Sequence, residues 1–517
     1  MNTRKTEVLI IGSGFGAAAP ALRLSEAGVK VLMIEKGPNI IPDRDFKMTS
    51  DPKYFLQYIH NKSSAQFDMT FAEGLGGGSP FYEMVSLRAP SIAFKQRDIQ
   101  NNLYWGGITR QMMDPFYEIA EQMLHVEQIA EDEVPKTGLV FSLMMKRLGY
   151  SCERARYAVK GCVGSGYCIS GCTFGAKQSL LINYLPQAMS SGTQILTDIE
   201  AKYIKPLGFD NNRNTDIDNL SQIPYRYEVL CKNRKSDEEL TVQAKCIILG
   251  GGTFGTAALL LRSKEYLTFL SDHVGKNIAF NGSVKAIGLL PDDLPEGDMV
   301  TGRTHPGMIS YHFLHTHGIT VSAVKAQPVH AVSAARFWTT TTDDRPGDWG
   351  EAGDALMRQY RNRMFILYAL GLTPPLGRIV MKSNSTFEPA LEITEELRQY
   401  YHSTKEVLNS ILTRNGCKLV NYAMLDGEGQ DMEKIHFGTT HMIGSARMGK
   451  SIKEGVTDYN GEVFNYPGIF VTDGACVPTS LAVNSSLTIL ANAERIASRM
   501  VRRFGRNVVE LPILSKG

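Results

Sequence analysis

The sequence predicts an α/β protein of at least two domains, one of them built on a parallel sheet assembled from distant parts of the chain. Its 517 residues exceed the roughly 250–300 residues that a single hydrophobic core fills. An apolar strand, a glycine-rich turn and a helix follow one another near the N-terminus, and the same unit recurs at residues 246–262. Two such units so far apart indicate a parallel sheet in a discontinuous domain.

The composition fits a globular protein and excludes several classes of partner. Apolar residues make up 43% and charged residues 21% of the chain, which excludes wholesale disorder. Lys and Arg number 55 against 53 Asp and Glu, so nothing points to a nucleic acid or an anionic membrane as partner. Eight Cys are too few for a disulfide scaffold. Because glycines interrupt the apolar run 246–261 and residues 7–11 lack a signal-peptide pattern, we expect a cytoplasmic protein without a membrane span.

The N-terminal unit has the features of a dinucleotide-binding turn. Val8–Ile11 is apolar throughout, as a buried parallel strand requires. Residues 12–17 then match G-x-G-x-x-[G/A], a helix is expected over 18–27, and an apolar strand over 29–34 ends in Glu35. Glycines let the backbone approach a pyrophosphate, the helix N-terminus offers free N–H groups, and Glu35 accepts from a ribose hydroxyl. The fingerprint predicts a bound dinucleotide without distinguishing NAD from FAD.

Two further glycine clusters extend this prediction. Residues 74–79 read G-L-G-G-G-S and lie among apolar and aromatic residues, unlike a Ser-rich or charged linker. We therefore expect their backbone to press against a planar ring or a phosphate. Residues 250–255 follow the apolar strand 246–249 and open a helix over 256–262.

Strand-like runs predict further sheet structure in the middle of the chain. Tyr225–Cys231 and Leu240–Gln243, separated by a charged stretch, predict a hairpin within the dinucleotide domain. His317–Val324 and Gly377–Lys382 predict strands of a second, substrate-binding domain.

The C-terminal segment carries the most specific motifs. Residues 441–449 read H-M-I-G-S-A-R-M-G, 468–474 read G-I-F-V-T-D-G, 484–488 read N-S-S-L-T and 493–497 read A-E-R-I-A. Together with residues 74–79, Trp105 with D-P-F-Y at 114–117, and V-G-K-N at 274–277, they resemble the glucose–methanol–choline (GMC) flavoprotein oxidoreductase family. The chain departs from the family pattern where Met442 and Ser485 replace prolines.

The resemblance implies FAD as the cofactor and a GMC-like α/β fold. It implies a discontinuous Rossmann-type FAD-binding domain at residues 1–284, with cap or loop insertions around 40–70 and 120–185. A substrate domain on an antiparallel sheet follows at 285–431, and residues 432–517 return to the FAD-binding domain with the catalytic residues. The implied reaction is oxidation of a primary or secondary alcohol to an aldehyde or ketone by hydride transfer to flavin N5. Oxygen or another electron acceptor then re-oxidises the flavin.

The resemblance also implies roles for individual residues. It makes His441 the acceptor of the hydroxyl proton, which suits an imidazole that titrates near neutrality, and Asn484 the partner that orients the substrate oxygen. His436 is the nearest rival, but only His441 has R-M-G six residues on. Asn484 also precedes a helical pattern over 486–501, where it would serve as an N-cap. The expected cofactor contacts are Gly12, Gly14, Phe15, Gly16, Glu35, Lys36, Gly76, Gly77, Gly78, Ser79, Ile199, Gly251, Asp473, Gly474, Ser485 and Leu487.

Cysteine and histidine clusters give weak metal patterns. Three cysteines lie in a glycine-rich segment, but their x5 and x3 spacings miss the C-x2-C pairs of zinc and iron–sulfur sites. Related flavoproteins have a similar loop ending in G-A-K-x-S, as residues 175–179 do here. We expect no metal at either cluster: Cys162, Cys168 and Cys172, with Cys152 nearby, and His312, His315 and His317.

Substrate identity rests on the segment that matches the family least. Tyr82 sits where sterol-oxidising relatives usually have Asn, and Asn281-Gly282 stands where many relatives have His. In the acidic segment 339–354, Asp343 and Asp344 are bracketed by Trp338 and Trp349. Aromatic plates beside carboxylates suit a sugar ring that bears ammonium groups. The hypothesis is an aminosugar substrate of the kind found in antibiotic biosynthesis, such as the 6′-hydroxyl of paromamine, bound by Tyr82, Trp338, Asp343 and Asp344.

Other functions stay open at this point. A sterol or long-chain alcohol oxidase of the same family is the first alternative. A lyase in which the FAD is only structural is the second. Retention of His441 and Asn484 argues against a third, a binding protein that has lost its chemistry.

Overall fold

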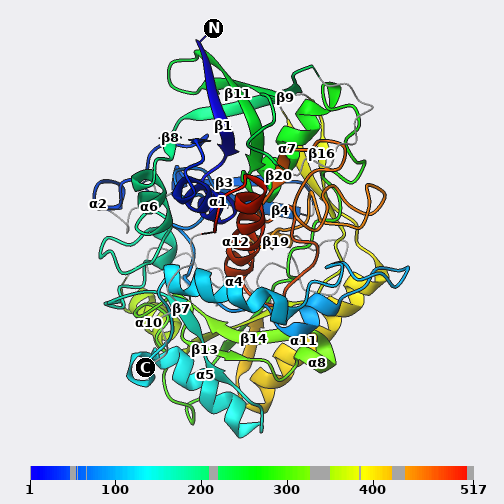
Figure 1. The fold of residues 1–517 in the computed structure, drawn as a ribbon. Helices are drawn as coiled ribbons and strands as arrows, with labels where there is room; N and C mark the ends of the chain where they lie inside the picture. Colours follow the sequence, from blue (N-terminus) through cyan, green and yellow to red (C-terminus); the bar gives the residue numbers. More distant parts are fainter. Residues whose placement is uncertain are drawn as a thin grey trace.

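The computed structural model describes residues 2–46, 54, 56–65, 67–208, 219–325, 350–383, 386–421 and 437–508. Two large sheets organise these residues. In Figure 1 one sheet lies toward the N-terminus at the top and the other at the bottom, with α12 (Ser486–Arg503) and α4 (Arg110–Met123) between them. The predicted class is therefore confirmed: an α/β fold with a Rossmann-type sheet and a separate antiparallel sheet.

The seven-stranded sheet has the order β8-β2-β1-β11-β10-β9, with β20 also paired to β11. The pairs β2–β8, β1–β2, β1–β11 and β11–β20 are parallel, and β9 and β10 complete an antiparallel edge. Its strands come from both ends of the chain, which confirms that this sheet is discontinuous in sequence. They are β1 (Asn2–Ile11), β2 (Val31–Ile34), β8 (Gln194–Leu196), β9 (Ile199–Pro206), β10 (Tyr227–Asn233), β11 (Glu239–Leu249) and β20 (Ile469–Val471).

One strand of this sheet is longer than the sequence indicated. The predicted hairpin exists, but its second strand does not end at Gln243. Leu240–Gln243 and the apolar run 246–249 form one continuous strand, β11. Its first part, next to β10, includes the partly exposed Gln243 and Lys245, whereas its end, next to β20, is buried at every position. This change of neighbours explains why one strand looked like two.

The six-stranded sheet is antiparallel throughout and has the order β18-β12-β15-β14-β13-β6. Five strands lie within the predicted substrate domain, and β6 adds a strand from the preceding segment. The domain boundaries at 284 and 431 stay predictions. The strands are β6 (Glu153–Arg154), β12 (Val284–Leu289), β13 (Met308–Ser310), β14 (Ile319–Val324), β15 (Met364–Gly371) and β18 (Lys418–Asn421).

Two predictions about this region are wrong in detail. The strand expected from His317 begins at Ile319, because His317 ends the short helix α8 (Leu314–His317) and Gly318 closes it at φ +68°. Residues 377–381 do form a strand, but it pairs with β17 in a separate two-stranded sheet. The three small sheets are β16 (Gly377–Met381) with β17 (Phe387–Leu391), β19 (Phe437–Thr439) with β4 (Phe67–Ala72) and β3 (Ile59–Ser63), and β5 (Val126–Gln128) with β7 (Arg156–Ala158).

Helices cover the sheets and carry the glycine turns. Among the described residues, no helix is long and apolar enough to cross a membrane; the cytoplasmic location stays a prediction. The remaining α-helices are α1 (Phe15–Glu26), α2 (Pro42–Asp45), α5 (Lys136–Arg147), α6 (Tyr184–Ser190), α7 (Gly252–Arg262), α10 (Gly350–Arg363) and α11 (Glu395–Arg414). The 3-10 helices are η1 (Ser91–Lys95), η2 (Glu131–Glu133), η3 (Cys168–Ser170) and η4 (Ser263–Glu265).

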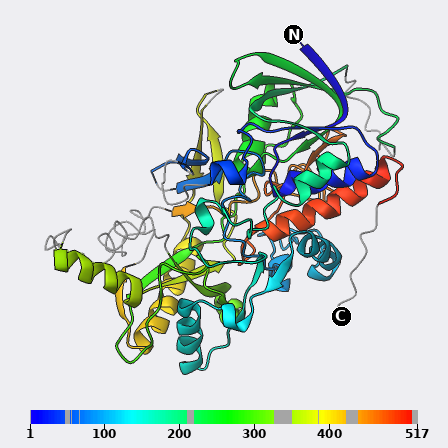
Figure 2. The ribbon, with the colours of Figure 1, turned by 90° about the vertical axis from the view of Figure 1, so that its left-hand side faces the viewer.

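A buried ion pair joins the first helix to the last. Figure 2 shows α1 and α12 side by side. Arg23 donates from Nε and Nη2 to the two carboxylate oxygens of Glu494, at 2.8 and 2.9 Å, and Tyr184 donates to the same carboxylate at 2.7 Å. All three side chains are buried, so the pair links residues from both ends of the sequence within one core.

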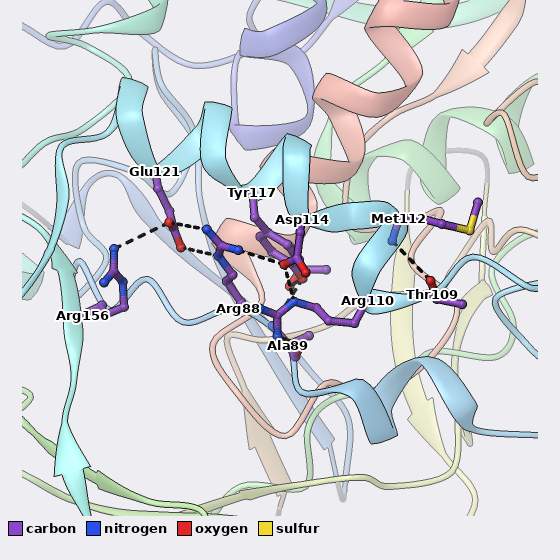
Figure 3. A network of polar contacts seen from close by, with 10 residues as sticks. Arg88, Ala89, Thr109, Arg110, Met112, Asp114, Tyr117, Glu121 and Arg156 are labelled. Atoms are coloured by element: carbon purple, nitrogen blue, oxygen red, sulfur yellow. Dashed lines mark hydrogen bonds and ion pairs between the residues drawn. The ribbon is translucent and has the colours of Figure 1, made fainter. Parts of the chain in front are cut away.

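Helix α4 is fixed beneath α12 by a network of charges. Arg88 lies between Glu121 and Asp114 of α4, and Arg110 reaches the same Asp114 (Figure 3). Thr109 caps the helix by accepting from the backbone N–H of Met112. The network holds the face of α4 that carries Tyr117 toward α12.

Candidate active site

The three glycine loops meet at the carboxyl ends of β1 and β11. A Cβ at Gly12 would lie 2.3 Å from the carbonyl oxygen of Gly250, and one at Gly77 would lie 2.9 Å from Cα of Gly14. A Cβ at Gly16 would lie 2.2 Å from Cα of Asp473. Only glycine permits these approaches. Gly14 begins α1 without a side-chain cap. The N–H groups of Ala17 and Ala18 bond to the Gly14 carbonyl, so the residues before them are the ones whose N–H groups can bind a phosphate.

Glu35 lies at the end of β2, where the fingerprint places the ribose-binding acid. Its Oε2 accepts from the Ser13 hydroxyl at 2.7 Å and its Oε1 from the Gly37 N–H at 2.9 Å. Ser13 also accepts from the Gly76 N–H at 2.9 Å, which ties the first glycine loop to the second. Burial raises the pKa of Glu35, and these hydrogen bonds offset part of the shift. Each carboxylate oxygen keeps a second lone pair for a ribose hydroxyl.

Asp473 organises the third glycine loop. Its Oδ2 accepts from the Gly252 N–H at 2.7 Å and the Thr256 hydroxyl at 2.6 Å, and its Oδ1 accepts from Ala475 N–H at 2.8 Å. Burial raises its pKa to about 6 despite these bonds. The carboxylate therefore caps α7 from within the protein, next to Gly251, which is the N-cap residue of α7.

The other predicted cofactor residues surround the same region. Lys36 pairs with Glu73, and Ile199 donates its N–H to the carbonyl of Glu35. Ser79 bonds within its own loop to Gly76, whereas Gly78 has open space where a Cβ would stand. Gly474 accepts from Gly444 N–H, and Ser485 and Leu487 are buried at the start of α12. These glycine cradles and the acid at the end of β2 fit a dinucleotide whose pyrophosphate lies at the N-terminus of α1.

His441 and Asn484 meet beside this cradle. Asn484 Nδ2 lies 3.2 Å from His441 Nε2. Because an amide nitrogen only donates, the pair holds the imidazole in the tautomer whose Nε2 carries the lone pair. Asn484 does not cap α12: that position belongs to Ser485, which makes no side-chain cap bond. Burial lowers the pKa of His441 to about 4, and the ammonium of Lys285 adds to the shift.

Asn281 clamps the loop that carries Asn484. Its Oδ1 accepts from the Leu481 N–H at 2.7 Å and its Nδ2 donates to the Val483 carbonyl at 2.8 Å. Thr320 adds a bond from its hydroxyl to the carbonyl of Ala482 at 2.6 Å. Asn281 is fully buried and adopts φ +56°, a conformation that Asn tolerates better than most residues.

Two aromatic residues anchor the same loop at either end. Trp105 Nε1 donates to Thr479 Oγ1 at 3.1 Å, and the Tyr117 hydroxyl lies 2.8 Å from Thr488 Oγ1. Tyr117 belongs to α4, whose charged network is drawn in Figure 3. Trp105 and Tyr117 thus both fix the segment around Asn484, which gives a structural reason for the family pattern that contains Trp105 and residues 114–117.

The predicted substrate residues have different outcomes. Tyr82 lies against Phe15 of the first glycine loop, with ring centroids 5.3 Å apart, and its hydroxyl donates to the carbonyl of Gln178 at 3.0 Å. Its side chain is half-buried, and the ammonium of Lys177 lies 5.8 Å from the centroid of its ring. Trp338, Asp343 and Asp344 lie outside the described residues, as does His436.

The candidate metal residues do not form a cluster. Within the described ranges, no group of three or more His, Cys, Asp and Glu side chains lies close enough to hold a metal ion. All eight cysteines are unpaired. His315 and His317 lie on the short helix α8.

Two charged residues, Lys285 and Glu83, were not predicted as site residues, although Lys285 acts on the pKa of His441 and Glu83 on that of Lys285. Lys285 lies in β12 and Glu83 follows Tyr82 in the loop after the second glycine cluster. Neither residue belongs to a recognised sequence motif. The one available signal is that each is a lone charge in an otherwise apolar run, V-K-A-I-G-L and F-Y-E-M-V.

Comparisons with known proteins agree with this arrangement. Residues 8–280 and 374–493 match the two family models described as GMC oxidoreductase. A cholesterol oxidase of Mycobacterium tuberculosis is 26% identical, over 95% of this chain and 90% of its own length. A long-chain-alcohol oxidase of Arabidopsis thaliana is 22% identical, over 96% of this chain and 67% of its own. The pyridoxine 4-oxidase structure from Mesorbium loti has a TM-score of 0.69 at 16% identity, covering 95% of this chain and 98% of that one.

Proposed function

The chain belongs to the GMC oxidoreductase family and is an FAD-dependent alcohol oxidoreductase, and on that premise we propose that it oxidises a hydroxyl of a polar, sugar-like substrate at His441. The observation that carries the proposal is the contact between His441 Nε2 and Asn484 Nδ2 beside the three glycine loops. It places a proton acceptor and a hydrogen-bond donor 3.2 Å apart, so both side chains can contact the oxygen of one alcohol.

His441 takes the hydroxyl proton on Nε2, where the substrate hydroxyl replaces the Asn484 amide as the hydrogen-bond donor. Its lowered pKa keeps the ring neutral at physiological pH, and the amide of Asn484 fixes the tautomer. FAD, when bound, supplies the acceptor for the hydride that leaves the same carbon. The alcohol thereby loses one proton to His441 and one hydride to the cofactor, which leaves an aldehyde or a ketone. Reoxidation then falls to oxygen or to another acceptor.

The proposed substrate is an aminosugar or a related polyol. Besides burial, the half-buried ammonium of Lys285 lowers the pKa of His441, and the half-buried carboxylate of Glu83 acts on the pKa of Lys285 in turn. A sterol or a long alkyl chain would cover them without offering hydrogen bonds, at a cost in desolvation. These charged side chains therefore favour a polyhydroxylated substrate over a sterol or a long-chain alcohol.

Flavin absorbance under anaerobic conditions tests the proposal. The purified holoenzyme is mixed with polyols, amino sugars, 1-decanol and cholesterol, and bleaching of the flavin is followed. We expect bleaching by polar alcohols, with one carbonyl formed per flavin reduced. Formation of a carbonyl without bleaching would instead indicate a lyase with a structural flavin. Faster bleaching by cholesterol or 1-decanol would refute the polar substrate.

A further inference from the structure

One short stretch of chain, residues 279–281, holds both of the segments that carry His441 and Asn484. On one side, Asn281 clamps the loop of Asn484 through its two side-chain hydrogen bonds. On the other side, the first residue of the stretch and Ile443 exchange two backbone hydrogen bonds, at 2.8 and 2.9 Å. Because Ile443 lies two residues after His441, the same stretch reaches both members of the pair.

Thr439 connects His441 to this stretch through its side chain. The hydroxyl oxygen accepts from the His441 N–H at 2.9 Å, and the hydroxyl donates to the carbonyl of Phe280 at 3.2 Å. A threonine hydroxyl is both a donor and an acceptor, and Thr439 uses both capacities. Its side chain is only 5% exposed, so bulk water does not reach the two backbone groups in its place.

The position of Thr439 is fixed by packing. Thr439 ends β19, which pairs in parallel with β4 and places Thr439 opposite Met69 (Figure 1). The ring of Phe280 lies 5.5 Å from that of Phe67 in β4 and 6.5 Å from that of Phe437 in β19, measured between centroids. The hydroxyl of Thr439 and the carbonyl that it bonds are therefore held by the same group of aromatic rings.

A second hydroxyl ties the backbone after His441 to the third glycine loop. Thr253, in the first turn of α7, donates from its hydroxyl to the carbonyl of Met442 at 2.6 Å. The neighbouring Gly252 donates its N–H to Asp473. The backbone is thus held at the N–H of His441 and at the carbonyl of the next residue, and these two points fix the direction in which the imidazole leaves the chain.

We propose that Thr439 is a positioning residue for the proton acceptor: its hydroxyl joins the His441 backbone to residues 279–281 and so sets the place of His441 relative to Asn484. The proposal rests on the role proposed above for His441. Both ends of the 3.2 Å contact between His441 Nε2 and Asn484 Nδ2 depend on adjacent residues of one stretch. A proton acceptor has to stay within hydrogen-bond reach of the substrate hydroxyl. Loss of the Thr439 hydroxyl therefore slows the chemical step and leaves the affinity for the alcohol largely unchanged.

Variants of Thr439 test the proposal on the holoenzyme. Thr439→Val keeps the shape of the side chain without the hydroxyl, Thr439→Ser keeps the hydroxyl, and Thr439→Cys has a weak donor and acceptor in its place. Thr137→Val is the matched control. The buried Thr137 hydroxyl also accepts from a backbone N–H and donates to a carbonyl, both of Asp298, outside the segments that hold His441 and Asn484.

Anaerobic flavin reduction is measured over a range of concentrations of the alcohol that bleaches the wild-type flavin fastest. Thr439→Val should lower the limiting rate about 10-fold to 100-fold, since displacing a reacting group by about 1 Å can cost about 100-fold. The half-saturating alcohol concentration should change little. Thr439→Cys should give an intermediate rate, and Thr439→Ser should regain most of it. Thr137→Val should keep the wild-type rate.

The same substitution in the His441→Ala background separates positioning from a general structural effect. There, Thr439→Val should cause no further slowing, because the group that it positions is already absent. FAD content and thermal midpoint are recorded for every variant, so that a loss of rate is compared among enzymes that retain the cofactor.

Four outcomes would overturn the inference. If Thr439→Val and Thr439→Cys both reduce the flavin at the wild-type rate, the hydroxyl does not position the acceptor. If Thr439→Val slows His441→Ala by the same factor as it slows the wild type, the hydroxyl acts elsewhere. If it raises the half-saturating concentration and leaves the limiting rate unchanged, the hydroxyl serves substrate binding. If both variants lose FAD while Thr137→Val retains it, Thr439 is structural.

Failure of the proposed function would look different. It would appear as a wild-type flavin that no alcohol bleaches, or as His441→Ala reducing its flavin at the wild-type rate. Neither result involves a variant of Thr439.

Discussion

Replacing Asn281 with Ala should disable catalysis without touching His441, Asn484 or the glycine loops. The substitution removes the acceptor for Leu481 N–H and the donor to the Val483 carbonyl, at 2.7 and 2.8 Å, from a site with no exposed surface. Leaving a buried backbone group unsatisfied costs about 1–3 kcal/mol. The two groups together thus favour a displaced loop by roughly 2–4 kcal/mol after partial relaxation, which corresponds to a roughly 30-fold to 900-fold slower reaction.

Single-turnover flavin reduction without oxygen measures this effect. Asn277→Ala is the matched control, because Asn277 also has a left-handed backbone, at φ +61°, but its amide bonds to His273 rather than to the catalytic loop. FAD content and thermal midpoint are recorded for both variants. Asn281→Ala should keep FAD and lose rate, whereas Asn277→Ala should keep both. A rate within twofold of wild type for Asn281→Ala would refute the idea that this clamp positions Asn484.

Four other expectations concern the cofactor, the base and the core. His441→Ala should keep the flavin and slow its reduction by roughly 10²–10⁴-fold, the span of a general base. Because a depressed pKa of about 4 keeps His441 neutral above that value, the wild-type reduction rate should stay level from neutral pH and decline only as pH falls through about 4; a decline centred near 6.5 would contradict the burial. Gly12→Ala should abolish FAD retention, since its Cβ would lie 2.3 Å from a carbonyl oxygen, whereas Gly255→Ala, with open space, should not, as flavin absorbance will show. Arg23→Met should lower the thermal midpoint, because it strands the buried carboxylate of Glu494 at a cost of about 3–5 kcal/mol, and adding Glu494→Leu should recover most of the loss.

The sequence predicted the parts of the site that depend on backbone geometry and missed those that depend on tertiary neighbours. Gly12 and Gly16 can be predicted from the sequence because no other residue permits the close approaches that they make. Asn281 is buried 200 residues before its partner Leu481, and nothing local reveals that pairing. Asn281 stands where many family members have His, and from the sequence this difference bears only on the choice of substrate.

Two strand boundaries were predicted wrongly because they depend on features of the fold that the local sequence pattern does not show. On one side β11 pairs first with β10 and then with β20, and the partly exposed Gln243 and Lys245 interrupt its apolar pattern, so that it resembles two strands. His317 looked like the start of a strand because its sequence continues into Ile319–Val324, yet Gly318 in a left-handed conformation ends a helix there. Lys285 was overlooked because a single charge in an apolar strand has no motif, and only the register with β15 places it beside Tyr368.

The central claim is that His441 removes a proton from an alcohol while the flavin takes its hydride. Its most direct test is one anaerobic turnover of the wild-type enzyme and of His441→Ala with the alcohol that bleaches the flavin fastest, following flavin absorbance and carbonyl product together. The account predicts one carbonyl per bleached flavin in the wild type, and both signals slowed by the same factor in the variant. Carbonyl formation without bleaching, or bleaching of His441→Ala at the wild-type rate, would contradict it.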